Sequence, residues 1–218
     1  MLPHEALQSQ VQVERSLLSR VLGWLAVSLV LTTVGVYLSG SYADQLVRLW
    51  WLVALAAFGL LIATQFAERS GRHPLAIGLF AAFAVTEGLF IGPLVLAYLQ
   101  AQPDTVGNAL LGTVGIFFVA ASIVYMTSLN MAAWGKWLFG ALIVGIIGSV
   151  AAIFIPFDRL LLDVFLGVVF IGLTFFDFWR VKAQRAGDND ALMLAISLYL
   201  DLLNLFLILL RLFGRARN

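Results

Sequence analysis

Glu87, Asp177 and Asp201 are acidic residues that stand inside long apolar stretches of this sequence. A charge within the hydrocarbon of a bilayer is costly, so each of these acids is a candidate functional residue. Structural alternatives exist for two of them. Glu87 would be harmless if protonated or paired with an arginine, and Asp177 lies three residues before Arg180, the spacing of an ordinary ion pair near a helix end. Asp201 is at least ten residues from either end of its apolar stretch and has no such explanation.

Asp177 and Asp201 are placed symmetrically about the connection between the last two apolar stretches. They are 24 residues apart, and their midpoint, residue 189, falls within the connecting segment 180–190. Positions equidistant from the turn of an antiparallel helical hairpin lie at similar depth, so the two carboxyl groups are expected to meet. Two buried carboxylates cannot both be ionised cheaply and therefore share a proton. This pair is predicted to be a pH sensor, or a site for a hard cation such as calcium, which prefers oxygen ligands.

The last apolar stretch carries a polar stripe. Ser197, Asp201, Asn204, Ile208 and Arg211 follow one another at spacings of 4, 3, 4 and 3, which places them on one helical face. A polar stripe on a membrane helix faces protein or water and not lipid. The last helix is therefore expected at the centre of the protein, with Asn204 and Arg211 supporting the pathway or switch.

The composition identifies the elements that carry these residues. Of 218 residues, 62% are hydrophobic and 11% charged, whereas a soluble domain has about 45–50% and about 25%. This balance excludes a soluble enzyme, a nucleic-acid binder and a disordered chain. A membrane-crossing helix needs about 20 apolar residues. Seven stretches qualify or nearly do: Val21–Leu38, Trp50–Ala67, Leu75–Leu99, Val106–Ser128, Trp134–Ile155, Leu160–Trp179 and Ala191–Phe213.

The predicted fold is an all-α membrane protein, a seven-transmembrane-helix bundle with the last helix central. Residues 1–20 are an N-terminal tail, for which a short interfacial helix and a frayed end are both open. Residues 21–214 form a single seven-helix transmembrane domain, and residues 215–218 a basic C-terminal tail. Gly88 and Gly92 in the third stretch are interpreted as positions of close helix packing.

Orientation follows from the arginines and lysines near the spans. Eight of them fall on the side of the N-terminus: Arg15, Arg20, Arg69, Arg72, Lys136, Arg180, Lys182 and Arg185. The loops of the opposite side carry only Arg48 and Arg159, which favours a cytoplasmic N-terminus. Three arginines at the basic C-terminal end conflict with seven complete spans, and a half-inserted last helix would resolve that conflict.

Nothing in the sequence indicates an enzyme. Cysteine is absent, and the two histidines, His4 and His73, lie outside the long apolar runs. No serine pairs with a histidine or lysine inside a span, and no HExxH metal motif occurs. No cofactor is therefore expected, other than calcium as a permeant or bound ion, and no nucleic-acid partner.

Several segments resemble the Bax inhibitor (transmembrane Bax inhibitor motif) family, above all its bacterial branch. Residues 197–211, SLYLDLLNLFLILLR, followed by a Leu-Phe-Gly, closely resemble its C-terminal signature. Residues 87–94, EGLFIGPL, are similar to its third span, and Gly112-Thr113 and Trp134-Gly135 to its fourth and fifth. The resemblance covers essentially the whole chain.

The resemblance implies six helices around the last one, and a pH-sensitive calcium leak across a membrane. It also implies suppression of cell death in eukaryotes and, for some bacterial members, modulation of a membrane-anchored AAA protease. The family's paired aspartates correspond to Asp177 and Asp201, and a family arginine at the end of the second span to Arg69. One departure concerns Asp177, which has Phe176, Phe178 and Trp179 as neighbours where the family often has polar residues.

The predicted function is therefore a pH-sensitive cation (calcium) leak channel or exchanger in a bacterial inner membrane. Its partners would be the lipid bilayer and calcium or protons. The alternative is a non-transporting membrane regulator that binds a membrane-anchored AAA protease or another membrane protein. Buried acids at matched depth favour the first function, because a docking protein has no need of them.

Overall fold

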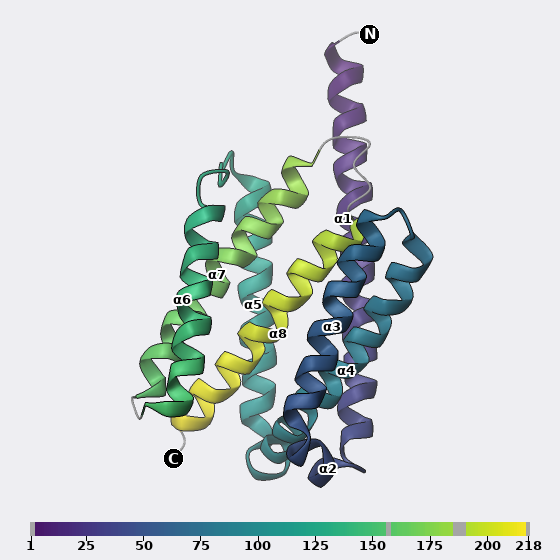
Figure 1. Ribbon diagram of the computed structural model, residues 1–218. Coiled ribbons are helices and arrows are strands. Elements are labelled where there is room, and N and C mark those ends of the chain that lie inside the picture. Colours follow the sequence, from purple (N-terminus) through teal and green to yellow (C-terminus); the bar gives the residue numbers. More distant parts are fainter. Residues whose placement is uncertain (1–2, 156–157, 185–190, 217–218) are drawn as a thin grey trace. The chain divides into compact units, whose positions relative to one another are not determined.

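The computed structural model describes residues 3–155, 158–184 and 191–216, which form eight helices and no strand (Figure 1). The helices are α1 (Pro3–Ser39), α2 (Ala43–Arg48), α3 (Trp50–Arg69), α4 (His73–Ala101), α5 (Pro103–Met126), α6 (Gly135–Phe154), α7 (Arg159–Ala183) and α8 (Ala191–Ala216).

Seven of these helices are long and apolar enough to cross a membrane, and α2 is the exception. The spanning part of α1 is Leu17–Ser39, and mean hydropathy in the seven lies between 1.7 and 2.3. The predicted all-α class and the number of spans are confirmed. Helix ends differ from the predicted ones by a few residues, because polar ends such as Arg69 and Arg159 continue the backbone hydrogen bonding of an apolar helix.

Two features of the helices were not predicted from the sequence. The connection after the first span contains the six-residue helix α2, which hydropathy does not reveal. Helix α1 runs without a break from Pro3 into the first span, so no helix end separates the predicted tail 1–20 from the membrane domain. At the other end α8 continues to Ala216, and the remainder of the predicted basic tail lies outside the described residues.

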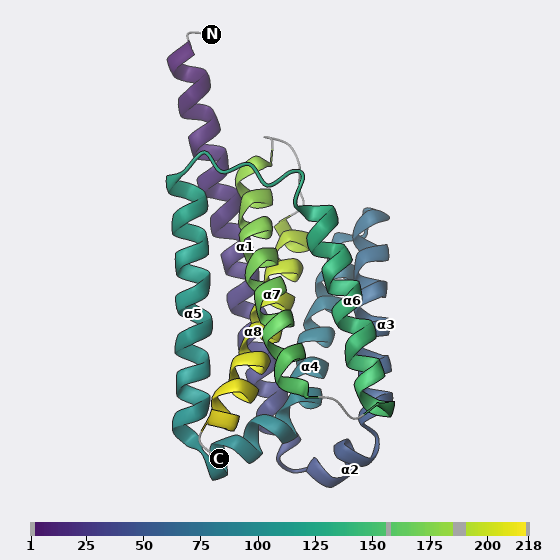
Figure 2. The same cartoon turned by 90° about the vertical axis from the view of Figure 1, so that its left-hand side faces the viewer.

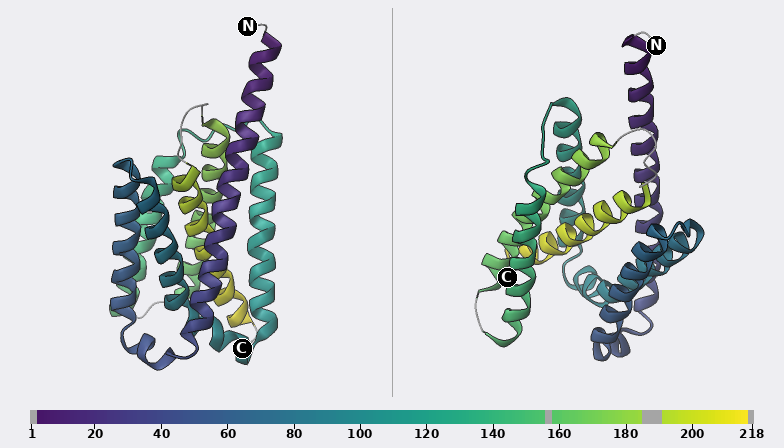
Figure 3. Two further views of the ribbon diagram at one scale, coloured as in Figure 1. Left: turned by 90° about the vertical axis from the view of Figure 1, so that its right-hand side faces the viewer. Right: turned by 45° about the horizontal axis from the view of Figure 1, so that its top comes forward.

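The chain divides into two compact units. The N-terminal unit contains α1 from Leu17, α2, α3, α4 and the part of α8 that ends at Tyr199. The C-terminal unit contains α5, α6, α7, the part of α8 that begins at Leu200 and, from the start of the chain, the part of α1 that ends at Ser16. Helices α6 and α7 lie along one another in the C-terminal unit (Figure 2), and α3 and α4 do so in the N-terminal unit (Figure 3).

Glycines bring α1 and α4 into backbone contact in the N-terminal unit. A Cβ atom added to Gly88 would collide with the carbonyl oxygen of Thr32 and lie 2.8 Å from Cα of Gly35. One added to Gly92 would collide with the side chain of Ser39. The close-packing interpretation of Gly88 and Gly92 is confirmed, and α4 continues as one helix through Pro93 to Ala101.

Helix α8 is the most enclosed of the spanning helices. In its most apolar window 61% of the residues are buried, against 39% for α4 and 6% for α6. No residue of α8 from Ala191 to Leu212 is exposed. The predicted central place of the last helix is confirmed by this burial, and it explains why a helix of such hydropathy can carry an aspartate.

Candidate functional site: the carboxyl cluster of α7 and α8

Asp177 on α7 and Asp201 on α8 are both buried in the C-terminal unit, with exposed fractions of 6% and 4%. Asp201 lies within electrostatic range of Asp177 and of Arg180. No hydrogen bond joins the two carboxyl groups directly within the described residues. The structure thus brings the predicted pair together, while a shared proton or a bridging water between them stays a prediction.

Arg180 balances the charge of one of the two aspartates. Its Nη1 donates to Oδ1 of Asp177 at 3.1 Å across one helical turn, which is the ion pair that the sequence offered as an alternative for Asp177. Asp201 is different, because its Oδ2 is buried and has no hydrogen-bond partner among the described residues. A buried acceptor without a donor is costly, and protonation or an approaching cation relieves that cost.

Aromatic rings surround this cluster. Phe178 is buried and meets Phe117 of α5 edge to face, with ring centroids 5.7 Å apart. Phe176 stacks on Trp179 at 5.7 Å, and the guanidinium of Arg180 lies 6.0 Å from the centre of the Phe176 ring. Of the residues that depart from the family pattern, Phe176 therefore holds Arg180 by a cation–π contact and Phe178 packs against α5.

Arg211 pairs with an acid that the sequence analysis missed. Its Nε and Nη2 both lie 2.9 Å from Oδ1 of Asp163, which is buried on α7. The midpoint of Asp163 and Arg211 is residue 187, inside the same connecting segment as that of Asp177 and Asp201. The symmetry that predicted the aspartate pair would therefore have found this ion pair as well. Arg215 and Asp158 form a third pair at 3.5 Å.

The other predicted site residues lie as follows. Asn204 is half-buried and donates to the carbonyl of Leu200 at 2.8 Å, a bond within α8 and not one to an aspartate. Glu87 and Arg69 belong to the N-terminal unit. Glu87 is half-buried on α4, within electrostatic range of Tyr199, and Arg69 is exposed at the end of α3, with no ion pair to any described residue.

A cluster around Tyr199 in the N-terminal unit also escaped the sequence analysis. The ring of Tyr199 is fully buried and meets Phe80 and Phe83 of α4 edge to face, at 5.8 and 5.9 Å. Its hydroxyl shares a hydrogen bond of 2.7 Å with the hydroxyl of Thr32 on α1. Tyr199 thereby ties α8 to α1 and α4. Its only signal in the sequence was its position two residues before Asp201.

Few side chains that could ligate calcium lie at the cluster. Within the described ranges no group of three or more His, Cys, Asp or Glu residues could hold a metal ion. Calcium takes six to eight oxygen ligands, of which Asp177 and Asp201 would supply a part, and calcium at this pair stays a prediction.

The comparisons with known proteins agree with this architecture. The family described as "Inhibitor of apoptosis-promoting Bax1" matches residues 14–218. The chain is 26% identical over 219 residues to the inner membrane protein YbhL of Escherichia coli, covering 92% of each chain. It is 30% identical over 168 residues to the modulator of FtsH protease YccA of Escherichia coli, covering 76% of this chain and 74% of that protein.

Seven apolar helices and inner-membrane relatives define the class: this is a multi-pass helical protein of the bacterial inner membrane. Because the match covers nearly the whole chain, the protein belongs to the Bax inhibitor family. The family resemblance of the last span, the third span and the fourth and fifth is thereby confirmed.

Proposed function

We propose that this protein is a pH-sensitive cation (calcium) leak channel or exchanger, gated by Asp177 and Asp201. The observation that supports it most is the buried, unpartnered Oδ2 of Asp201 beside an acid that already has its arginine. A purely structural ion pair would need only Asp177 and Arg180. The second acid adds a group whose charge depends on protonation and which faces the interior of a spanning helix pair.

The gating step follows from the charges. With Asp201 protonated, Asp177 and Arg180 cancel and the cluster is neutral. When Asp201 loses its proton, the cluster becomes negative and two carboxylates face each other in an apolar site. Two like charges about 4 Å apart repel by about 4 kcal/mol at an effective dielectric constant of 20. That is comparable with the few kcal/mol that separate conformational states, so ionisation separates α7 from α8 and acid pH favours the closed form.

The same charges make the open form attractive to cations. A carboxylate pair with a single arginine carries one net negative charge, which an incoming calcium ion neutralises. Because the side chains supply few ligands, calcium is bound weakly and can leave, as conduction requires. Arg211 does not compete for the cluster, since Asp163 occupies it.

Calcium flux into liposomes, measured as a function of pH, tests this function. The parent protein should leak more calcium as pH rises, and Asp201→Asn should remove that dependence and stay closed. Asp44→Asn is the control, because Asp44 is exposed on α2 outside the spans. An Asp201→Asn variant that leaks with the pH profile of the parent would refute the gate.

A second function is supported by the relationship to YccA, which is named a modulator of FtsH protease. In that case the protein binds a membrane-anchored AAA protease and changes its activity without conducting ions. Degradation of a membrane substrate by such a protease, co-reconstituted with this protein, distinguishes the two. Altered degradation without any calcium flux would favour the regulator and leave the acid pair a structural role.

A further inference from the structure

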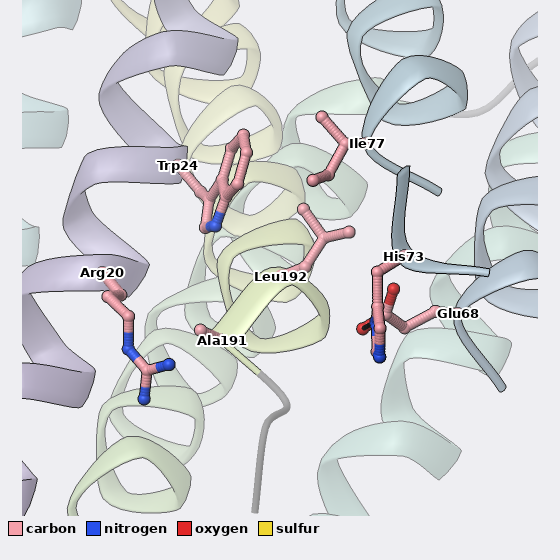
Figure 4. Close-up of a pocket in the computed structure, with 7 residues that line it drawn as sticks. All are labelled: Arg20, Trp24, Glu68, His73, Ile77, Ala191 and Leu192. Atoms are coloured by element: carbon pink, nitrogen blue, oxygen red, sulfur yellow. Dashed lines mark hydrogen bonds and ion pairs between the residues drawn. The ribbon is translucent and has the colours of Figure 1, made fainter. Parts of the chain in front are cut away.

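A pocket of about 180 Å³ opens in the N-terminal unit, apart from the carboxyl cluster (Figure 4). Its walls come from α1, from the end of α3 and the start of α4, and from the first residues of α8. For comparison, an apolar cavity of about 150 Å³ admits a benzene molecule. The pocket therefore has room for a small organic group, and none of its residues takes part in the proposed gate.

One wall holds a buried acid with a free oxygen. The side chain of Glu68 is 8% exposed, and its Oε1 lies 2.9 Å from Nδ1 of His73, which is 57% exposed. Its Oε2 is buried and has no hydrogen-bond partner among the described residues. The turn that brings the two residues together depends on Gly71, whose φ of +71° suits glycine. A carboxylate with an incomplete set of hydrogen bonds thus belongs to the lining of the pocket.

The opposite wall is basic and apolar. Figure 4 shows Arg20 across the pocket from Glu68 and His73, with Trp24 further along α1. Ile77 and Leu192 complete the lining with apolar surface. An anion would be attracted by Arg20 but repelled by Glu68. A cation would be attracted by Glu68 but repelled by Arg20. A zwitterion satisfies both walls.

We propose that this pocket binds a phosphoethanolamine group, its phosphate toward Arg20 and its ammonium toward the carboxylate of Glu68. The position of the pocket favours a lipid headgroup as the source. It lies where α3 ends and where α4 and α8 begin, the level at which spanning helices leave the hydrocarbon. Trp24 is the residue type that anchors at this level, and Ile77 and Leu192 can contact the start of an acyl chain.

Native mass spectrometry of the purified protein with added lipids tests the proposal. We expect phosphatidylethanolamine to be retained about tenfold more tightly than phosphatidylcholine, because a trimethylammonium cannot donate to Glu68 and a charge-assisted hydrogen bond is lost. Glu68→Gln should abolish that preference. Arg20→Gln should weaken both lipids equally and leave their ratio unchanged, because both carry the phosphate.

Arg72→Gln is the matched control, since Arg72 is exposed in the same turn and does not line the pocket. Arg20 is also exposed, so its variant keeps the test informative even if Glu68→Gln fails to fold. Free phosphoethanolamine, compared with phosphatidylethanolamine in the same experiment, separates the sources: tighter retention of the lipid assigns the site to the bilayer lipid, and equal or tighter retention of the free group assigns it to a soluble zwitterion. Equal retention of the two lipids by the parent, or a preference that survives in Glu68→Gln, would overturn the proposal.

Discussion

The two parts of α8 are fastened by different chemistry. In the N-terminal unit its anchor is neutral: Tyr199 shares a hydrogen bond with Thr32 and lies against two phenylalanines. In the C-terminal unit α8 meets α7 through charges, at Asp201 beside Asp177 and at Arg211 with Asp163. Neutral contacts do not change with pH over the physiological range, whereas carboxyl contacts do. The continuous helix α8 is thus held at one part by uncharged contacts and at the other by contacts whose charge depends on pH.

This difference determines which contacts of α8 change when Asp201 gains or loses a proton. Tyr199 and Asp201 are two residues apart, yet they belong to different units. A change of charge at Asp201 leaves the hydrogen bond of Tyr199 with Thr32 chemically unaltered. The response of α8 to the charge of Asp201 is therefore expected within the C-terminal unit, between α7 and α8, while the part of α8 that ends at Tyr199 keeps its contacts.

The largest expected effect is a loss of stability in the N-terminal unit. Gly88→Leu should destabilise the protein by about 3 kcal/mol or more, because the new side chain meets the backbone of α1 at Thr32 and Gly35. Thermal unfolding in detergent measures the loss. Gly78→Leu on the same helix is the control, since a Cβ atom there meets nothing within 4 Å, and equal destabilisation by both variants would contradict the packing account.

The next largest effect is expected from breaking the ion pair of Asp163 and Arg211 in the C-terminal unit. Arg211→Gln should cost about 2 kcal/mol, because Asp163 is left buried without its partner. The double variant Asp163→Asn/Arg211→Gln should recover most of that stability, since no charge then remains unpaired. Chemical unfolding of Arg211→Gln, of Asp163→Asn and of the double variant gives the coupling, and additive losses would show that the two residues do not interact.

Asp201→Asn should change stability by about 1–2 kcal/mol, with a sign that depends on pH. Ionising a buried acid is unfavourable, so the parent loses stability as pH rises and Asp201 is deprotonated. The variant lacks that loss and should be the more stable protein at alkaline pH, while the two are similar at acid pH. Unfolding curves from pH 5 to pH 9 test this, and parallel curves would mean that Asp201 keeps one charge state throughout.

The smallest effect is expected at Tyr199. Tyr199→Phe removes one hydrogen bond and retains the ring contacts, so it should cost about 1 kcal/mol at every pH. Thr32→Val, which removes the other hydroxyl, should give a similar loss. A pH-dependent cost in either variant would break the distinction between the neutral and the charged part of α8.

Some of this protein is determined by the sequence alone. Continuous apolar runs require helices in a membrane, because only a helix satisfies its backbone hydrogen bonds without water or neighbours. Hairpin symmetry then places Asp177 beside Asp201, and the polar stripe requires α8 to be enclosed. These conclusions depend on composition, length and periodicity, and none needs to know which helix lies beside which.

Only the tertiary structure decided the partners. Asp163 looks like an interfacial acid until α8 brings Arg211 to it. Glu68 and His73 look like solvated loop residues until the turn at Gly71 pairs them beside a pocket that α1 also lines. Hydropathy reports the mean preference of a segment for lipid or water. Which polar atom finds a donor depends on side-chain directions from helices distant in the chain, and packing alone sets those.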